Sequence, residues 1–189
     1  MLISDSHKFA FYHYPRTAGS AITGALAPLL RNPRPVVLGP HWQLRHHVDN
    51  IQHHPVFDCG EPPKGYFKAS FVRNPFEIVL SAWNGQRISF EEFVMTKVRQ
   101  RQVPTAKWSQ YHFLTYNGKL LVDFVGRHEN LQMDFDKFCY HTRVPKRKIN
   151  PLNESSTDKG HYRDHYNRRT AAIVTAMWKD DLNYFGYKY

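Results

Sequence analysis

The sequence predicts an α/β fold, a single domain with a central parallel sheet flanked by helices. A strand, a tight turn and a helix follow one another twice, over 8–30 and again over 66–83. A third apparent strand at 120–131 leads into a further helix. Strands that alternate with helices form parallel sheets with both faces covered. In such sheets ligands gather at the carboxyl ends of the strands.

The two repeated units are recognised from their composition. KFAFYHY at 8–14 is aromatic-rich and is followed by a proline, as expected for a short buried strand before a turn. The residues from 20 to 30 then predict a helix. In the second unit YFKASFV at 66–72 predicts a strand, RNP at 73–75 stops it, and FEIVLSAW at 76–83 continues with helical spacing.

The segments between and after these units are less regular. Residues 31–65 are rich in Pro, His and Gly and predict a loop-rich excursion over the site, with one short helix over 43–51. Residues 89–116 predict one or two helices, of which SFEEFVMTKVRQR is the clearest. No repeat, low-complexity tract or linker divides the chain. We therefore expect one domain over 1–189.

The C-terminal third continues the α/β pattern. After the third strand, Asn130 is placed to cap a helix that extends through Phe138. A basic loop precedes a last helix, expected over 162–179. Four apolar residues have the spacing of a core face on that helix: Ala172, Ile173, Ala176 and Met177.

Length and charge limit the classes of function. The 189 residues, 41% of them hydrophobic, are enough for one globular domain with a continuous core. Lys and Arg number 26 against 16 Asp and Glu, which gives a formal net charge of +10. This charge predicts a polyanionic partner, but it does not distinguish a nucleic acid, a membrane surface and a phosphorylated small molecule.

Two features of the sequence bear on compartment. Cys59 and Cys139 are too few for a disulfide framework and form no CxxC, so we expect two ordinary buried thiols. The first residues have no long apolar run after a basic start, and no stretch reaches the roughly 18 apolar residues of a membrane span. We expect a cytoplasmic protein with no signal peptide, no transmembrane segment and no membrane insertion.

The turn between the first strand and the first helix has the composition of an anion site. The first N–H groups of a helix lack intrahelical partners and lie at the positive end of its dipole. Arg16 adds a forked cationic donor, Thr17 and Ser20 add hydroxyls, and Gly19 permits close approach of the backbone. The alternative is an ordinary capped turn. The phosphate loop G-x-x-x-x-G-K-[ST] is not matched, because the Gly-Lys-Ser/Thr is missing and the spacing differs.

Four stretches, taken in order, resemble one family. HYPRTAGSAI resembles the 5'-phosphosulfate loop, usually H-I-P-K-T-A-G-T-S, of the carbohydrate (heparan 2-O-like) sulfotransferases that use 3'-phosphoadenosine 5'-phosphosulfate (PAPS). FKASFVRNPFEIVLSAW is similar to that family's 3'-phosphate segment. FVGRHENLQMDFDKF is similar to its central strand and helix, and LNESSTDKGHYRDHY with DDLNYFGY to its C-terminal end. The resemblance implies the P-loop-NTPase-like sulfotransferase fold.

The resemblance also implies a set of nucleotide-binding residues. Those around the 5'-phosphosulfate are Arg16, Thr17, Ala18, Gly19, Ser20 and Ala21. Those on the 3'-phosphate are Arg73 and Ser81, and a guanidinium with a hydroxyl two helical turns away suits that role. The alternative is that Arg73 is only the last residue of the strand and pairs with another side chain on the surface. Weaker candidates for closing over the nucleotide lie in the C-terminal loop: Ser155, Lys159 and Tyr162.

The catalytic residues implied are Arg16 and a histidine base. The family usually has lysine where Arg16 stands, and that lysine is thought to stabilise the bridging oxygen as the sulfuryl group leaves; arginine shares the charge with a different reach. His41 best matches the family's histidine, with His46 and His47 as fallbacks, and such a base is worth roughly 10²–10⁴ in rate. His13 is expected to be a strand residue at the sheet end.

The leading hypothesis is a sulfotransferase that moves a sulfuryl group from PAPS to a hydroxyl, with a carbohydrate as the expected acceptor. The histidines at 46–54 match no common zinc site, so no metal is expected. A kinase-like enzyme would need a Gly-Lys-Ser/Thr loop and an acidic magnesium ligand, and neither arrangement is found. Two alternatives stay open, an inactive nucleotide-binding protein and a basic nucleic-acid-binding module, although no recognised nucleic-acid motif accompanies the basic residues. The expected partners are therefore a sulfonucleotide donor and a hydroxyl acceptor, and no nucleic acid.

Overall fold

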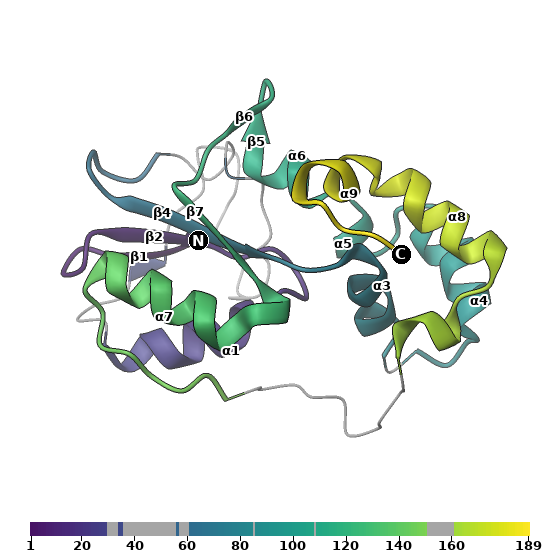
Figure 1. Ribbon diagram of the computed structural model, residues 1–189, viewed down its shortest axis with the longest axis horizontal. Coiled ribbons are helices and arrows are strands. Elements are labelled where there is room, and N and C mark those ends of the chain that lie inside the picture. The colour runs from purple at the N-terminus through teal and green to yellow at the C-terminus, as the bar shows by residue number, and fades with distance from the viewer. Residues whose placement is uncertain (30–33, 36–55, 57–60, 85, 108, 151–160) are drawn as a thin grey trace. The chain divides into compact units, whose positions relative to one another are not determined.

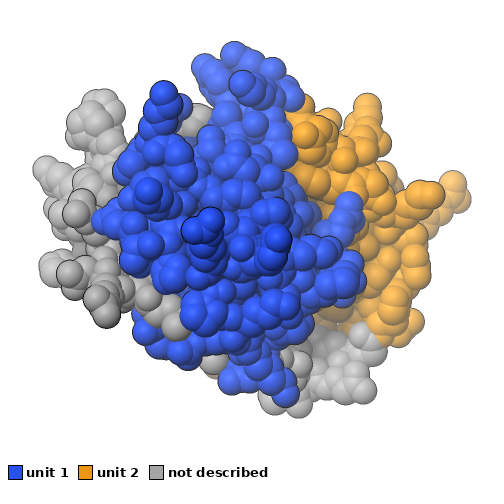
Figure 2. All heavy atoms as spheres, turned by 60° about the vertical axis from the view of Figure 1, so that its left-hand side comes forward, with its two compact units in different colours: residues 1–72, 112–152 blue, residues 73–111, 153–189 orange. Residues whose placement is uncertain are grey.

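A computed structural model describes residues 1–29, 34–35, 56, 61–84, 86–107, 109–150 and 161–189. The chain forms two compact units, each made of two separate stretches. Unit 1 contains 1–72 and 112–152, and unit 2 contains 73–111 and 153–189 (Figure 2). The expected single domain over 1–189 remains a prediction.

Unit 1 is built on a mostly parallel sheet in the order β3-β1-β2-β4-β7. Figure 1 labels four of these strands, β1, β2, β4 and β7. Its central strands β2, β4 and β7 pair in parallel, while β1 and β3 add an antiparallel edge that the sequence did not indicate. A separate antiparallel pair is formed by β5 and β6. The strands are β1 (Leu2–Ser4), β2 (Phe9–Tyr12), β3 (Arg34–Pro35), β4 (Phe67–Val72), β5 (Thr115–Tyr116), β6 (Lys119–Leu120) and β7 (Phe124–Arg127).

Two helices cover one face of this sheet, α1 (Gly19–Leu26) and α7 (Leu131–Thr142) (Figure 1). The alternation along β2 and β4 places four side chains on that face, and they pack against both helices: Phe9, Phe11, Ala69 and Phe71. Residues of the opposite face are buried as well: Ala10, Tyr12, Ser70 and Val72. The α/β class with a central, mostly parallel sheet flanked by helices is therefore confirmed.

Short helical turns complete the connections of unit 1. The chain continues from α1 through a 3-10 turn at Ala27–Leu29 and enters α7 through another at His128–Asn130. Asn130 stands at the N-cap position of α7 as expected, but its side chain makes no capping hydrogen bond. Helix α7 also runs to Thr142, one turn beyond the predicted end.

Unit 2 is helical. Its elements are α3 (Pro75–Trp83), α4 (Phe90–Phe93), a π-helix at Val94–Val98, α5 (Pro104–Lys107), a 3-10 turn at Tyr162–His165, α8 (Arg168–Met177) and α9 (Lys179–Phe185). A further helix, α6 (Gln110–Leu114), begins in unit 2 and ends in unit 1. The core of unit 2 contains several aromatic side chains: Phe76, Phe90, Phe93, Tyr162 and Trp178. None of the helices in the described part of the chain is long and apolar enough to cross a membrane.

The last predicted helix is divided, and its predicted core face is confirmed at Ile173 and Met177, which pack against the core of unit 2, but not at the two alanines. Asn167 caps α8, because its Oδ1 accepts a hydrogen bond from Thr170 N at 2.9 Å and so begins a new helix there. The buried positions of α8 are Thr170 and Val174, followed by Trp178, whereas the predicted Ala172 and Ala176 are exposed. Small residues fit either face of a helix, so they indicate its orientation poorly.

Candidate functional site

Parallel strands of unit 1 end at one edge of the sheet. β2 and β4 run in register with Tyr12 opposite Ser70, and β7 continues the parallel pairing on the other side of β4. The Ser70 hydroxyl donates a hydrogen bond to the Tyr12 carbonyl oxygen at 2.8 Å, which ties the ends of β2 and β4 together. Residues 13–18 follow β2 at this edge, the position where α/β sheets bind ligands.

The turn after β2 contains two left-handed residues. The φ angle is 66° at Arg16 and 65° at Ala18, a conformation that costs a side-chain-bearing residue about 1–2 kcal/mol. Thr17 between them is only 1% exposed, and its Oγ1 donates to the Tyr14 carbonyl oxygen at 2.9 Å. The proton of the Thr17 hydroxyl is therefore used within the turn rather than toward an anion.

Helix α1 begins without a side-chain cap. Its N-cap residue is Ala18, and no side-chain hydrogen bond caps this helix in the described structure. The residues that follow begin the helix and lie at the positive end of its dipole: Gly19, Ser20 and Ala21. Arg16 and Ser20 are exposed beside them. This end of α1 can bind an anion through backbone N–H groups.

The ring of His13 lies against Gly19. A Cβ atom at position 19 would overlap the Cδ2 and Nε2 atoms of that ring. His13 is buried at the end of β2 and stacks on Phe11, with ring centroids 6.4 Å apart and an interplanar angle of 17°. The absent side chain of Gly19 thus makes room for His13, whereas the sequence argument assigned that space to the approach of the backbone to an anion.

Helix α3 begins with a cap of its own. The Asn74 side-chain oxygen accepts a hydrogen bond from Phe76 N at 3.1 Å, and Pro75 occupies the first helical position. The Asn74 amide also donates to the Lys188 carbonyl oxygen at 3.3 Å. Because the protein itself closes this helix N-terminus, an anion at this turn is expected to be bound by side chains.

The side chain of Arg73 pairs with Glu77, one helical turn further on. Its Nε donates to the Glu77 Oε2 at 2.9 Å, and the two side chains are 20% and 29% exposed. This half-buried ion pair fixes the direction of the guanidinium from its Nε side. Ser81, two turns into α3, is also partly exposed.

The backbone of Arg73 is bonded to the side chain of Gln110. Arg73 N donates to the Gln110 Oε1 at 2.7 Å, and the Gln110 Nε2 donates to the Arg73 carbonyl oxygen at 2.9 Å. Gln110 is in turn bonded to Asp181, whose carboxylate accepts from its Nε2 at 3.0 Å and from its backbone N at 2.9 Å. Sequence reasoning missed both residues.

The Asp181 carboxylate is fully buried and accepts several hydrogen bonds. Besides those from Gln110, it accepts one from Tyr111 N at 2.8 Å and one from the Ser109 side chain. Burial raises the pKa of Asp181, while these hydrogen bonds oppose the rise because they stabilise the carboxylate. The carboxylate thereby supplies a cap for the first residues of α6.

A glycine and a carboxylate shape the end of β7. A Cβ atom at Gly126 would overlap the ring of Phe71 on the neighbouring strand β4. The buried carboxylate here belongs to Asp134, which accepts from Arg127 N at 2.8 Å and pairs with Lys137 at 2.8 Å. Glu129, two residues beyond the end of β7, is exposed.

One predicted site residue is buried in the core of unit 2, and others lie outside the described structure. Tyr162 is buried and stacks on Phe76, with ring centroids 6.1 Å apart and an interplanar angle of 19°, so its ring belongs to the core of unit 2. The other candidates of the C-terminal loop and the candidate bases lie outside the described residues: Ser155, Lys159, His41, His46 and His47.

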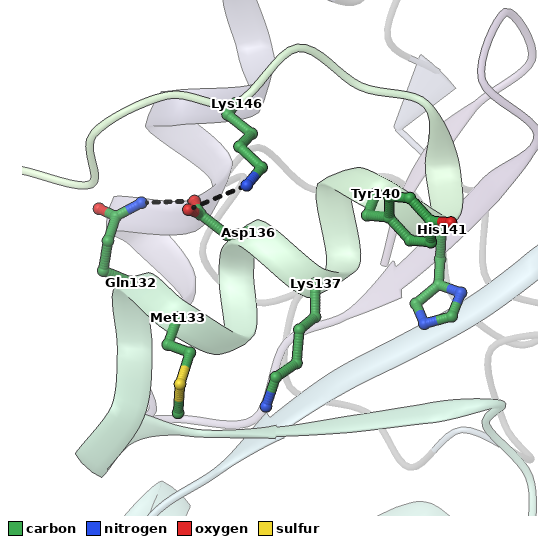
Figure 3. A pocket seen from close by; sticks show the side chains of 7 residues that line it. All are labelled: Gln132, Met133, Asp136, Lys137, Tyr140, His141 and Lys146. Atoms are coloured by element: carbon green, nitrogen blue, oxygen red, sulfur yellow. Dashed lines mark hydrogen bonds and ion pairs between the residues drawn. The ribbon is translucent and has the colours of Figure 1, made fainter.

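A separate open hollow lies on the outer side of α7, and none of the predicted site residues lines it (Figure 3). Gln132 and Lys146 both contact the Asp136 carboxylate there, at 2.8 and 3.6 Å, while Tyr140 is 79% exposed.

Among the described residues, no group of three or more His, Cys, Asp or Glu could hold a metal ion.

Comparison with known proteins assigns the family. The model of the sulfotransferase family matches residues 1–188. An uncharacterized protein of Archaeoglobus fulgidus is 28% identical over 126 residues, which cover 63% of this chain and 94% of the relative. No solved structure matches. With the family match extending over nearly the whole chain, and an uncapped helix N-terminus at the edge of a mostly parallel sheet, this protein belongs to the sulfotransferase family.

Proposed function

We propose that the protein transfers a sulfuryl group from PAPS to a hydroxyl group of a carbohydrate acceptor, and that residues 1–189 act as one sulfotransferase domain. The observation that carries the proposal is the N-terminus of α1, which lacks a side-chain cap and follows the exposed Arg16. A helix end of this kind binds phosphate or sulfate oxygens through N–H groups.

The 5'-phosphosulfate binds at the turn after β2. Gly19, Ser20 and Ala21 supply backbone N–H groups, and Arg16 supplies the positive charge. Thr17 and Ala18 contribute by holding the turn, Thr17 through its bond to Tyr14. The 3'-phosphate binds to the side chains of Arg73 and Ser81, which suits a helix whose N-terminus is already closed by Asn74. Ser155 and Lys159 are the remaining candidates for nucleotide contacts, and Tyr162 is the weakest of the C-terminal candidates because its ring packs in the core of unit 2.

The reaction is an in-line displacement at sulfur. The bond from sulfur to the bridging phosphate oxygen breaks, the acceptor oxygen bonds to sulfur, and 3'-phosphoadenosine 5'-phosphate (PAP) leaves. Arg16 stabilises the charge that develops on the bridging oxygen. A histidine accepts the proton of the acceptor hydroxyl, and His41 is the proposed base, with His46 and His47 next. No metal takes part in this scheme.

Titration calorimetry tests the donor site. PAP is titrated into the protein and compared with ATP and a short single-stranded oligonucleotide at the same salt concentration, because binding to a basic surface depends strongly on salt. Binding of PAP that is tighter than that of ATP supports the proposal, and an acceptor screen with radiolabelled donor follows. Equal binding of PAP and ATP, or preference for the oligonucleotide, contradicts it.

The His41→Ala variant tests the base. Its affinity for PAP is expected to equal that of the wild type, while sulfuryl transfer to a good acceptor falls by roughly 10²–10⁴. An unchanged rate moves the assignment to His46 or His47. Tight binding of PAP without transfer to any acceptor would instead favour the inactive nucleotide-binding protein, the alternative that arginine at position 16 keeps open.

A further inference from the structure

We propose that Gln110, oriented by Asp181, is a positioning residue for Arg73 and thereby sets the preference of the donor site for a 3'-phosphate. The inference rests on the proposed function, because it takes Arg73 as the ligand of that phosphate. Gln110 lies outside the four stretches that carry the family resemblance, and Asp181 lies in DDLNYFGY, for which the resemblance implies no phosphate-binding residue.

The first step is the pairing between Gln110 and the Arg73 backbone. The carboxamide of Gln110 bonds to both main-chain groups of Arg73, accepting from its N–H at 2.7 Å and donating to its carbonyl oxygen at 2.9 Å. Two hydrogen bonds to one residue restrict both backbone dihedral angles. Arg73 comes directly after β4 and directly before the cap of α3, so this pairing fixes the point from which its side chain extends.

The second step is the orientation of the carboxamide. Its Nε2 donates to the Asp181 Oδ2 at 3.0 Å. A carboxylate only accepts hydrogen bonds, so the NH₂ group of Gln110 must face Asp181, and the oxygen is left to face the Arg73 N–H. Gln110 and Asp181 are both 0% exposed, which removes competition from water. Asp181 therefore excludes the flipped amide, which could not accept from Arg73.

The third step is the side chain of Arg73. Its Nε donates to Glu77 at 2.9 Å, so the guanidinium is fixed at one side while Gln110 fixes the backbone. A guanidinium that is already oriented loses less conformational freedom when it binds a phosphate in the bidentate mode. The contacts at both ends of the residue thus favour a 3'-phosphate over a ligand that lacks one.

Capping of α6 does not account for the Gln110 side chain. The N-terminus of α6 is capped by the Asp181 carboxylate through the backbone N–H groups of Gln110 and Tyr111. Those two bonds do not involve the Gln110 carboxamide. Apart from its bond to Asp181, the hydrogen bonds of the carboxamide given by the structure go to Arg73 alone.

The test compares the binding of PAP and of adenosine 5'-monophosphate (AMP), which lacks the 3'-phosphate, to the full chain by calorimetry. Gln110→Met keeps the volume of the side chain and removes its hydrogen bonds. We expect the ratio of PAP affinity to AMP affinity to fall roughly fivefold or more, with AMP affinity unchanged. In an Arg73→Ala background the same substitution should leave the ratio unchanged. Gln100→Met is the matched control, because Gln100 is an exposed glutamine of the same unit.

Each other outcome is decisive. A Gln110→Met protein with the wild-type ratio, or with PAP and AMP weakened equally, overturns the inference and leaves the proposed function intact. A wild-type protein that binds PAP no better than AMP overturns both. If thermal denaturation finds Gln110→Met unfolded, Gln110→Asn, whose amide is one methylene shorter and cannot bond both Asp181 and the Arg73 backbone, is measured and interpreted in the same way.

Discussion

The two turns that follow β2 and β4 each lead into a helix, but the N-termini of these helices are capped differently. After β2, the backbone adopts left-handed conformations at Arg16 and Ala18, and α1 starts without a side-chain cap. After β4, Asn74 caps α3 and Gln110 bonds to the backbone of Arg73. The first turn leaves the first N–H groups of α1 without a side-chain cap, whereas in the second Asn74 caps Phe76 N and Gln110 holds the backbone of Arg73.

Because of this difference, the two turns should be sensitive to different kinds of substitution. The first turn should depend on backbone conformation and on the space at Gly19. The second should depend on side-chain hydrogen bonds and on the charge of Arg73. Substitutions in each turn, with a control elsewhere in the chain, test these two dependences separately.

The largest effect is expected from removal of the Arg73 charge. Arg73→Ala should weaken PAP binding by about 1.5–3 kcal/mol, because a hydrogen bond to a charged group is lost. Binding of AMP should change little. Calorimetry measures both, with Arg87→Ala, an exposed arginine of the same unit, as the control. Unchanged PAP affinity in Arg73→Ala would remove the 3'-phosphate assignment.

The next effect concerns the space at the first turn. Gly19→Ala should lower the free energy of unfolding by about 1–3 kcal/mol, because the new Cβ overlaps the His13 ring. Gly24→Ala, at an exposed position of the same helix, should raise it by about 0.5–1 kcal/mol. Urea unfolding compares the two variants. A shift in the same direction for both would show that the glycines act through helix propensity alone.

A smaller effect is expected at the cap of the second turn. Asn74→Ala should lower the free energy of unfolding by about 1 kcal/mol, since the bond from Phe76 N to the Asn74 side chain is lost. Asn74→Ser restores a capping oxygen and should recover most of the loss in the same urea titration. If alanine and serine behave alike at position 74, the cap contributes nothing.

The smallest effect belongs to the left-handed residue of the first turn. Ala18→Gly should raise the free energy of unfolding by about 0.5–1 kcal/mol, because glycine adopts a φ of 65° without steric cost. Ala27→Gly, at a right-handed helical position with φ of −51°, should lower it by a similar amount. Differential scanning calorimetry can compare the two melting temperatures. Destabilisation of both would mean that Ala18 is not strained.

Much of the fold could be predicted from short stretches. Composition and neighbouring prolines indicated the strands at 9–12 and 67–72 and the helix at 75–83. These signals are local and can be read from a few residues. The antiparallel edge formed by β1 and β3 was not, because strands of three and two residues carry too little pattern. On α8 the predicted core positions are confirmed for Ile173 and Met177 and wrong for Ala172 and Ala176, because alanines fit both sides of a helix.

The candidate binding residues of both turns, Arg16, Ser20 and Arg73, could be found from the sequence, since each follows a predicted strand or begins a predicted helix. Tertiary structure decided the contacts made at each turn. The inward bond of Thr17, the contact of His13 with Gly19, and the bonds of Gln110 to Arg73 and Asp181 follow from packing. Gln110 is 37 residues from Arg73 and 71 from Asp181 along the chain, and no local pattern links residues that folding alone brings together.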